Sequence, residues 1–122
     1  MGILDSRVAF VTGAGSGIGA AGAAAMAREG ARVVVTDLDG DAAEQVAAAI
    51  RAQGAAGEAR ALDVTRDADL TAAIRETIDR HGRLDVLHSH AGIQVEGTLE
   101  QVAVADMDAS WALNVRAHFV AA

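Results

Sequence analysis

A glycine-rich turn near the start of the chain restricts its possible folds more than any other feature. The segment from Thr12 to Gly19 reads Thr-Gly-Ala-Gly-Ser-Gly-Ile-Gly and lies between a β-branched run and an alanine-rich stretch of helical character. Glycines between a strand and a helix let a pyrophosphate approach the backbone and the positively polarised end of the helix. The turn therefore predicts a dinucleotide-binding site.

Several glycine patterns overlap here, so the register of the turn matters. The G-x-G-x-x-G pattern matches Gly17, Gly19 and Gly22, but it begins too far inside the helix to form the turn. The register Thr-Gly-x-x-x-Gly-x-Gly instead places Gly13 at the strand end and Gly19 where the helix packs on the sheet. We adopt this second register.

Short β-branched runs alternate with segments of helical periodicity along the whole chain, which is typical of parallel βαβ units. Strands are expected at 7–11, 32–36, 58–62 and 84–88, and helices at 17–29, 41–53, 67–81 and from about 105 to the last residue. The fold class is α/β, a Rossmann-type three-layer parallel sheet. Right-handed crossovers and the usual dinucleotide-fold topology predict the strand order 3-2-1-4, with the fourth strand at an edge.

The helical periodicity also predicts which side chains face the core. Asp41 and Glu44 form a capping-box pair that would open the second helix. The predicted inward faces are Ile18, Gly22, Ala25 and Met26 for the first helix, Ala43, Val46, Ala47 and Ile50 for the second, and Leu70, Ile74, Thr77 and Ile78 for the third.

Residues 1–122 are expected to form a single dinucleotide-binding domain that is incomplete at its C-terminal end. A dinucleotide fold comprises two mononucleotide-binding halves, and this sequence supplies one half and the start of the other. The last predicted helix also carries Trp111, Val115 and Phe119, which need cover. We therefore expect a fragment of a longer protein.

Composition narrows the possible partners and the compartment. The chain has 17 acidic and 10 basic residues, a formal charge of −7, which disfavours nucleic acid as a partner. It has no apolar run near the length of a membrane span, so no membrane association is expected. The absence of Cys fits a cytoplasmic location. All ten basic residues are Arg, and Tyr and Lys are both absent.

Asp37 predicts which dinucleotide is bound. It ends the second strand, about 20 residues beyond the turn, where a carboxylate can accept hydrogen bonds from the adenosine ribose. A 2′-phosphate about 4 Å away would be repelled by about 4 kcal/mol at an effective dielectric of 20. Leu38, Asp39 and Ser16 supply no compensating positive charge, so NAD is favoured over NADP. The alternative is that Asp37 is a strand-end turn residue beside Asp39.

Together these features resemble the short-chain dehydrogenase/reductase family over essentially the whole chain. Asp63-Val64 is similar to the family's Asp-Val pair, Ser89-His90-Ala91-Gly92 to its Asn-Asn-Ala-Gly segment, and Asn114 to its helix Asn. The turn and the resemblance imply these cofactor-binding residues: Gly13, Gly15, Ser16, Gly17, Ile18, Gly19, Asp37, Leu38, Asp63, Val64, His90, Ala91 and Gly92.

The resemblance implies an NAD(H)-dependent oxidoreductase that transfers hydride between the nicotinamide and a ketone or secondary alcohol. In the family a Tyr acts as general acid/base, a Lys four residues on lowers its pKa, a Ser orients the substrate, and the helix Asn holds a proton-relay water. Only Asn114 has a counterpart here, and Ser110 lies on the wrong element for the catalytic Ser. We expect the 122 residues alone to be inactive, and the complete protein to be a homo-oligomer acting on a small molecule.

Two other functions remain open from the sequence. A methyltransferase also places S-adenosylmethionine over a glycine-rich turn with an acid after the second strand, although Thr12, Asp63 and Asn114 speak against it. A non-enzymatic nucleotide-binding module is the other alternative. His88 and His90 would share a strand face, but no carboxylate or Cys stands at a suitable spacing, so no metal site is expected.

Overall fold

A computed structural model describes residues 2–93 and 96–122 as alternating strands and helices. In this part of the chain the strands are β1 (Val8–Thr12), β2 (Arg32–Asp37), β3 (Gly57–Ala61) and β4 (Val86–Ser89). The helices are α1 (Gly17–Arg28), α2 (Gly40–Ala52), α3 (Asp67–His81), α4 (Val104–Trp111), the π-helical turn η1 (Ala112–Arg116) and α5 (Ala117–Ala121).

The four strands form one parallel sheet in the order β3-β2-β1-β4, which confirms the predicted fold class and strand order. Phe10 in β1 is paired with Val34 in β2 on one side and with Leu87 in β4 on the other. Every residue of β1 is buried, whereas the edge strands β3 and β4 are mostly half-buried. The uniformly apolar β1 and β2 are therefore the centre of the sheet, as parallel strands covered on both faces should be.

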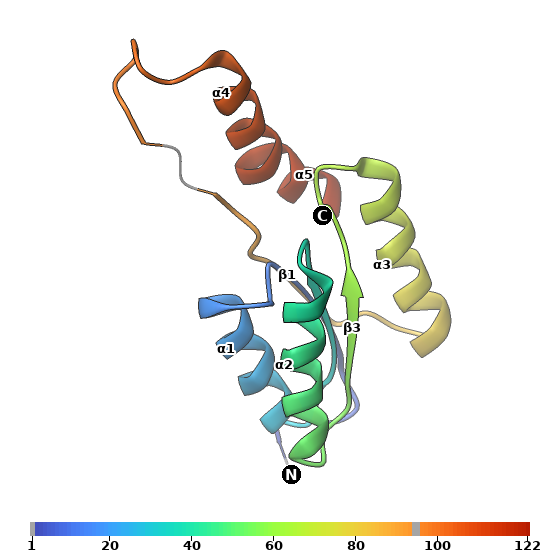
Figure 1. The fold of residues 1–122 in the computed structure, drawn as a ribbon. Coiled ribbons are helices and arrows are strands. Elements are labelled where there is room, and N and C mark those ends of the chain that lie inside the picture. The colour runs from blue at the N-terminus through green and yellow to red at the C-terminus, as the bar shows by residue number, and fades with distance from the viewer. Residues whose placement is uncertain (1, 94–95) are drawn as a thin grey trace.

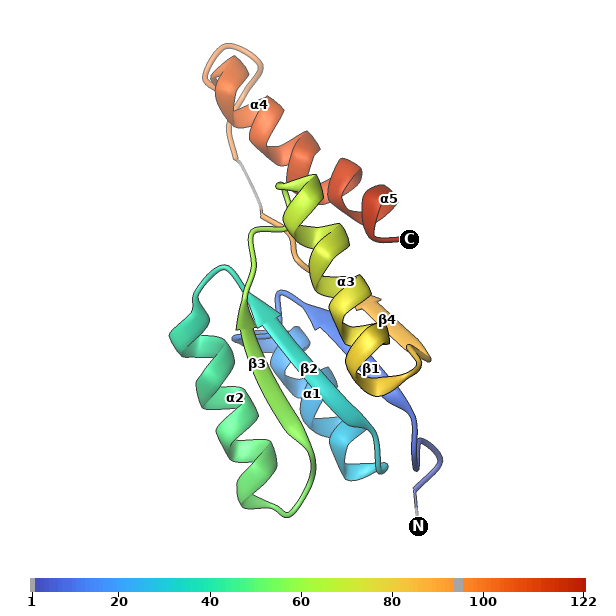
Figure 2. The same ribbon diagram turned by 90° about the vertical axis from the view of Figure 1, so that its right-hand side faces the viewer.

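Helices cover both faces of this sheet (Figures 1 and 2). Side chains alternate between the faces, so Val11 and Val35 pack with α1 and α2 while Phe10 and Val34 pack with α3 and α5. The first cluster is built largely from alanines, and the second contains the fully buried Leu70. The result is the predicted three-layer arrangement.

The predicted inward face of α1 is wrong except for Met26, which packs against the first cluster. Gly19, Ala23 and Ala27 are the buried residues, and Ile18 is 72% exposed. The helix lies so close to the sheet that a Cβ at Gly19 would fall 2.2 Å from the carbonyl oxygen of Gly13. Only very small residues fit such an approach, and a periodicity read from large apolar residues misses them.

The faces of α2 and α3 come out closer to prediction. Ala43, Ala47 and Ile50 of α2 are buried as expected, with Val46 packed against them. In α3, Leu70 and Thr77 are buried, but Ile78 is 41% exposed and Ala73 takes the inward position.

The predicted capping box of α2 is also wrong. The helix begins at Gly40, and the Asp39 side chain caps it by accepting hydrogen bonds from the N–H groups of Asp41 and Ala42. Glu44 pairs with Arg51 on the same helix instead of reaching back to the N-terminus. Two aspartates, each able to cap, stand two residues apart, and the earlier one does so.

The final predicted helix is interrupted. It begins at Val104, but the π-helical turn η1 separates α4 from α5. Arg116 in η1 forms a two-pronged ion pair with Asp67, the first residue of α3. Figure 1 shows α4 reaching out beyond the end of the sheet. None of the helices in the described ranges has the length and apolar character needed to cross a bilayer.

Candidate functional site

A cleft of about 640 Å³ opens where β1, β2 and β4 end and α1 begins. All of the predicted cofactor residues line it except Gly15 and Gly19, which lie behind the turn. The sequence did not single out the remaining lining residues, which are Leu62, Thr65, Ile93, Ala109, Ala112 and Leu113. The carboxyl ends of the strands of an open α/β sheet are the expected place for a ligand.

Gly13 and Gly17 of the turn both have a positive φ, but their surroundings differ. Gly13 has φ 62°, and a Cβ there would fall 2.7 Å from the Cα of Ala91. Gly17 has φ 57°, but a Cβ there would meet nothing within 4 Å. Gly17 also lines the cleft, so this open space lies where a phosphate would approach the backbone.

The N-terminus of α1 differs from those of the next two helices. Ser16 occupies the N-cap position without a side-chain hydrogen bond, and the first turn contains no acidic residue. By contrast, Asp39 caps α2, and Asp67 and Asp69 stand in the first turn of α3. The first turn of α1 therefore has neither a side-chain cap nor an acidic residue of its own, which leaves its N–H groups open to an anion.

The Asp37 carboxylate connects the glycine turn to the end of β2. One oxygen, Oδ2, accepts the backbone N–H of Gly15 at 2.9 Å, and the other, Oδ1, accepts that of Asp39 at 2.9 Å. The contact with Asp39 is the turn interaction that the alternative interpretation predicted. The contact with Gly15 holds the carboxylate at the cleft, beside the exposed Leu38.

Asp63 stands on the opposite wall of the cleft. Hydrogen bonds from the Thr65 hydroxyl (2.6 Å) and the Thr65 backbone N–H (3.0 Å) hold the pKa of Asp63 below its ordinary value. Both reach Oδ1, while Oδ2 lies 3.9 Å from the Arg66 Nε. The carboxylate is ionised at neutral pH and can accept a hydrogen bond from a ligand amino group.

Thr12 supplies a contact that sequence reasoning missed. Its buried hydroxyl oxygen accepts the backbone N–H groups of His90 (2.9 Å) and Ala91 (3.2 Å). These bonds fasten the segment after β4 to the end of β1, next to the Gly13 turn. A Thr at the end of a buried strand was the available signal, because a buried hydroxyl requires a partner.

Asn114 performs a similar role from the helical side. Its Oδ1 accepts the Ile93 N–H at 2.8 Å, and its Nδ2 donates to the Ile93 carbonyl at 2.8 Å and to the Ser110 hydroxyl at 3.0 Å. The side chain thus pairs with the loop backbone as a strand would. It ties η1 to the far wall of the cleft.

The histidines of β4 and its continuation lie on the same side of the sheet, as their spacing of two residues predicts. The rings of His88 and His90 lie 5.2 Å apart, and His90 lines the cleft. His88 packs near Gly22, where a Cβ would fall 3.2 Å from its ring, and Ser89 is hydrogen-bonded to His118. No group of three His, Asp or Glu side chains within residues 2–93 and 96–122 could hold a metal ion.

Comparison with known sequences agrees with this geometry. Residues 7–122 match the sequence profile of the short chain dehydrogenase family. The chain is 38% identical over 117 residues to D-threitol dehydrogenase of Mycolicibacterium smegmatis, covering 96% of this chain and 45% of that protein. It is 42% identical over 121 residues to versicolorin reductase 1 of Aspergillus parasiticus, covering 98% and 46%. The chain spans about half the length of these relatives.

Solved structures show the same likeness. A short chain dehydrogenase from Mycobacterium avium superimposes with a TM-score of 0.94 at 37% identity, covering 99% of this chain and 46% of that one. A metagenomic short-chain oxidoreductase in complex with NADP superimposes with a TM-score of 0.92 at 37% identity, covering 97% and 54%.

Proposed function

The chain belongs to the short-chain dehydrogenase family, and we propose that it is the cofactor-binding part of an NAD(H)-dependent oxidoreductase. The reaction would be hydride transfer between the nicotinamide and a ketone or secondary alcohol. Bound nicotinamide supplies the hydride chemistry, and the protein supplies binding, orientation and electrostatics. Membership of this family removes the methyltransferase alternative.

The residues around the cleft suit the parts of a dinucleotide. The uncapped N-terminus of α1, with Ser16 and Gly17, would receive the pyrophosphate. Asp37 would accept the hydroxyls of the adenosine ribose, and Asp63 would accept the adenine amino group. The segment from His90 to Gly92, fastened by Thr12, would flank the nicotinamide half.

The position of the Asp37 carboxylate at the cleft is the observation that supports the proposed preference for NAD. The carboxylate is held at the cleft by the Gly15 N–H, and no Arg lines the cleft. A 2′-phosphate at that place would meet one negative charge and no counter-charge among the lining residues. One related structure is a complex with NADP. The proposed preference for NAD therefore rests on residues of this chain and not on the cofactors of its relatives.

The proton-transfer chemistry needs groups that these 122 residues do not contain. The sequence has no Tyr and no Lys, so no Tyr-x-x-x-Lys pair can form within it. Asn114 remains the proposed proton-relay residue. Because its side chain is bonded to Ile93 and Ser110, its proposed contribution includes positioning the loop beside the nicotinamide. Small-molecule substrates and a homo-oligomeric state are part of the same proposal.

Titration of the full chain with NADH and NADPH tests this function. Asp37→Ala should weaken NADH binding by about 10- to 100-fold, because hydrogen bonds to a charged group contribute about 1.5–3 kcal/mol. NADPH binding should be reduced much less, so the preference for NADH narrows. Asp41→Ala, which removes an exposed carboxylate from the first turn of α2, is the matched control and should bind both as the native chain does. Unchanged NADH affinity in Asp37→Ala would contradict the proposal.

A further inference from the structure

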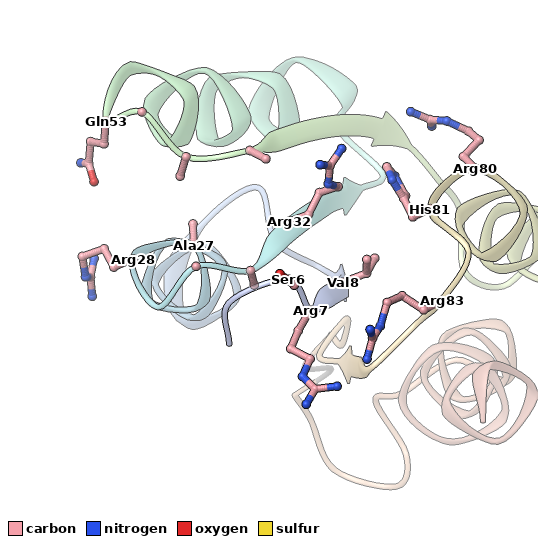
Figure 3. A pocket seen from close by; sticks show the side chains of 15 residues that line it. Ser6, Arg7, Val8, Ala27, Arg28, Arg32, Gln53, Arg80, His81 and Arg83 are labelled. Atoms are coloured by element: carbon pink, nitrogen blue, oxygen red, sulfur yellow. The ribbon is translucent and has the colours of Figure 1, made fainter. Parts of the chain in front are cut away.

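A second hollow, of about 1000 Å³, opens at the edge of the sheet opposite the cofactor cleft. The amino ends of the strands and the C-terminal ends of α1, α2 and α3 meet there (Figure 3). Its walls come from five parts of the chain, namely residues 6–8, residues 27, 28 and 30–32, residues 53–56, residues 80–81 and residue 83. Nothing in the proposed dehydrogenase function uses this hollow.

The lining of this hollow is strongly basic. Among the described residues, no acidic side chain lines the hollow. Five arginines and one histidine do: Arg7, Arg28, Arg32, Arg80, His81 and Arg83. The chain as a whole carries a formal charge of −7 and has ten arginines, so half of them border one opening. Such a concentration attracts anions against the overall charge of the chain.

Carboxylates outside the lining offset part of this charge. Asp85 pairs with two of the arginines and Glu58 with a third, and Asp5 lies against Gly30 at the edge. These ion pairs are Arg7–Asp85 at 3.6 Å, Arg83–Asp85 at 2.7 Å and Arg80–Glu58 at 2.6 Å. Because one carboxylate serves two arginines, the group keeps a positive balance.

Arg28 and Arg32 have no ion pair in the described part of the chain, and both are exposed. Arg28 stands in the last turn of α1, where a positive charge also complements the helix dipole. Arg32 is the first residue of β2 and has no such role. In Figure 3 its side chain lies in the same opening as those of His81 and Arg83. Arg32 is therefore exposed in the opening, with no ion pair in the described part of the chain and no helix end to complement.

The rest of the lining favours recognition by charge and hydrogen bonding. Small residues such as Gly30, Ala31 and Ala55 form much of the wall, and no Phe, Tyr or Trp is among the described residues that line it. Gln53 and Ser6 add neutral polar groups. Ser6 has φ 65° and is the only residue other than glycine with a positive φ in the described ranges, a conformation that often marks a binding site.

From these observations we propose that the hollow binds an oligophosphate anion, such as a chain of two or three phosphates. Guanidinium groups spaced around an elongated opening can contact several phosphates at once, each through paired N–H donors. A single phosphate would reach only a few of them. The same phosphate chain could arrive free or as part of a nucleotide, and its chemistry at the site is the same.

Isothermal titration of the full chain with inorganic tripolyphosphate at low ionic strength tests this site. We expect saturable binding that weakens as salt is added, because screening shortens the reach of exposed charges. The double variant Arg28→Gln/Arg32→Gln should weaken binding by at least about tenfold. Arg75→Gln removes an exposed arginine on α3, away from the hollow, and should change nothing. Equal melting temperatures without ligand show that the variants fold.

Two results would overturn the proposal. One is the absence of binding by the native chain. The other is equal affinity in the native chain, the double variant and Arg75→Gln, which would assign the anion to the glycine turn. A parallel titration with cytidine triphosphate distinguishes the sources: affinity equal to tripolyphosphate supports a free phosphate chain, and tighter binding with the same loss in the double variant supports a nucleotide.

Discussion

Thr12 combines burial with two hydrogen bonds that shape the cleft. Thr12→Val keeps the shape of the side chain but leaves the N–H groups of His90 and Ala91 without their acceptor. We expect the free energy of unfolding to fall by about 1–3 kcal/mol, the cost of unpaired buried donors. NADH binding should weaken as well, because both residues line the cleft. Urea denaturation and NADH titration measure the two effects.

Thr12→Ser is the matched control, since it keeps the hydroxyl and removes only a methyl group. It should bind NADH much as the native chain does. If Thr12→Val and Thr12→Ser proved equally stable, the two hydrogen bonds would not be holding the segment in place.

Asp85 makes the free energy of unfolding depend on pH in the acid range. Hydrogen bonds from Arg83 and from the Val8 backbone N–H lower its pKa from 3.8 to about 2. A depressed folded-state pKa contributes stability that is fully present above the unfolded value of 3.8 and is lost as pH falls towards 2. Asp85→Asn cannot titrate, so it should lack this contribution.

Denaturation midpoints of the native chain and Asp85→Asn, compared from about pH 6 down to about pH 2, measure the effect. The native chain should be the more stable above pH 4, and the gap should close as the carboxylate is protonated. If the difference between the two midpoints stayed constant over the whole pH range, the contribution of Asp85 would not depend on its charge.

The π-helical turn η1 and the loop after β4 are held together by one side chain. Asn114→Ala would remove both bonds to the Ile93 backbone. We expect faster hydrogen exchange at the Ile93 amide and weaker NADH binding, because Ile93 lines the cleft. Ser110→Ala removes the third bond of Asn114 but leaves Ile93 paired, so it should exchange as the native chain does. Equal protection in both variants would argue against the tether.

Elements with a strong local signal were predictable, and elements set by tertiary contact were not. The run of valines placed β2 inside the sheet, the usual dinucleotide-fold order placed β1 beside it, and glycines ended α2 and α3. The buried face of α1 was not predictable, because Gly19, Ala23 and Ala27 carry no apolar contrast and are selected by how closely the helix approaches β1. The η1 turn likewise has no glycine or proline to announce it.

The candidate site was likewise predictable where a local motif marks it and not where distant residues meet. The turn and Asp37 were visible as a motif with a fixed spacing, and the structure gathers them around one cleft. The supporting bonds from Thr12 and Asn114 to the segment after β4 required coordinates, because they join residues far apart in sequence. The basic hollow was not predictable for the same reason, since its arginines come from four segments that only the fold brings together.

Across the whole molecule, apolar surface concentrates on the C-terminal helices. Met107, Trp111, Val115 and Phe119 recur every four residues, a spacing that aligns them along one side of a helix. Their exposed fractions are 58%, 62%, 45% and 83%. A continuous apolar strip of this kind is typical of an interaction surface. None of the four residues lines the cofactor cleft or the basic hollow.

The chain spans about half the length of its relatives, and the described residues leave this strip uncovered. We therefore expect the strip to drive association of the 122-residue chain with a second copy of itself. Burying one large apolar side chain contributes about 1.5–3 kcal/mol, so replacing Trp111 and Phe119 together by Gln should weaken self-association by at least about a hundredfold. Sedimentation velocity over a range of concentrations measures the change. Ile3→Gln, which alters an 86% exposed apolar residue near the N-terminus, is the control and should associate as the native chain does. If the double variant associated as strongly as Ile3→Gln, the contact between copies would lie elsewhere on the molecule.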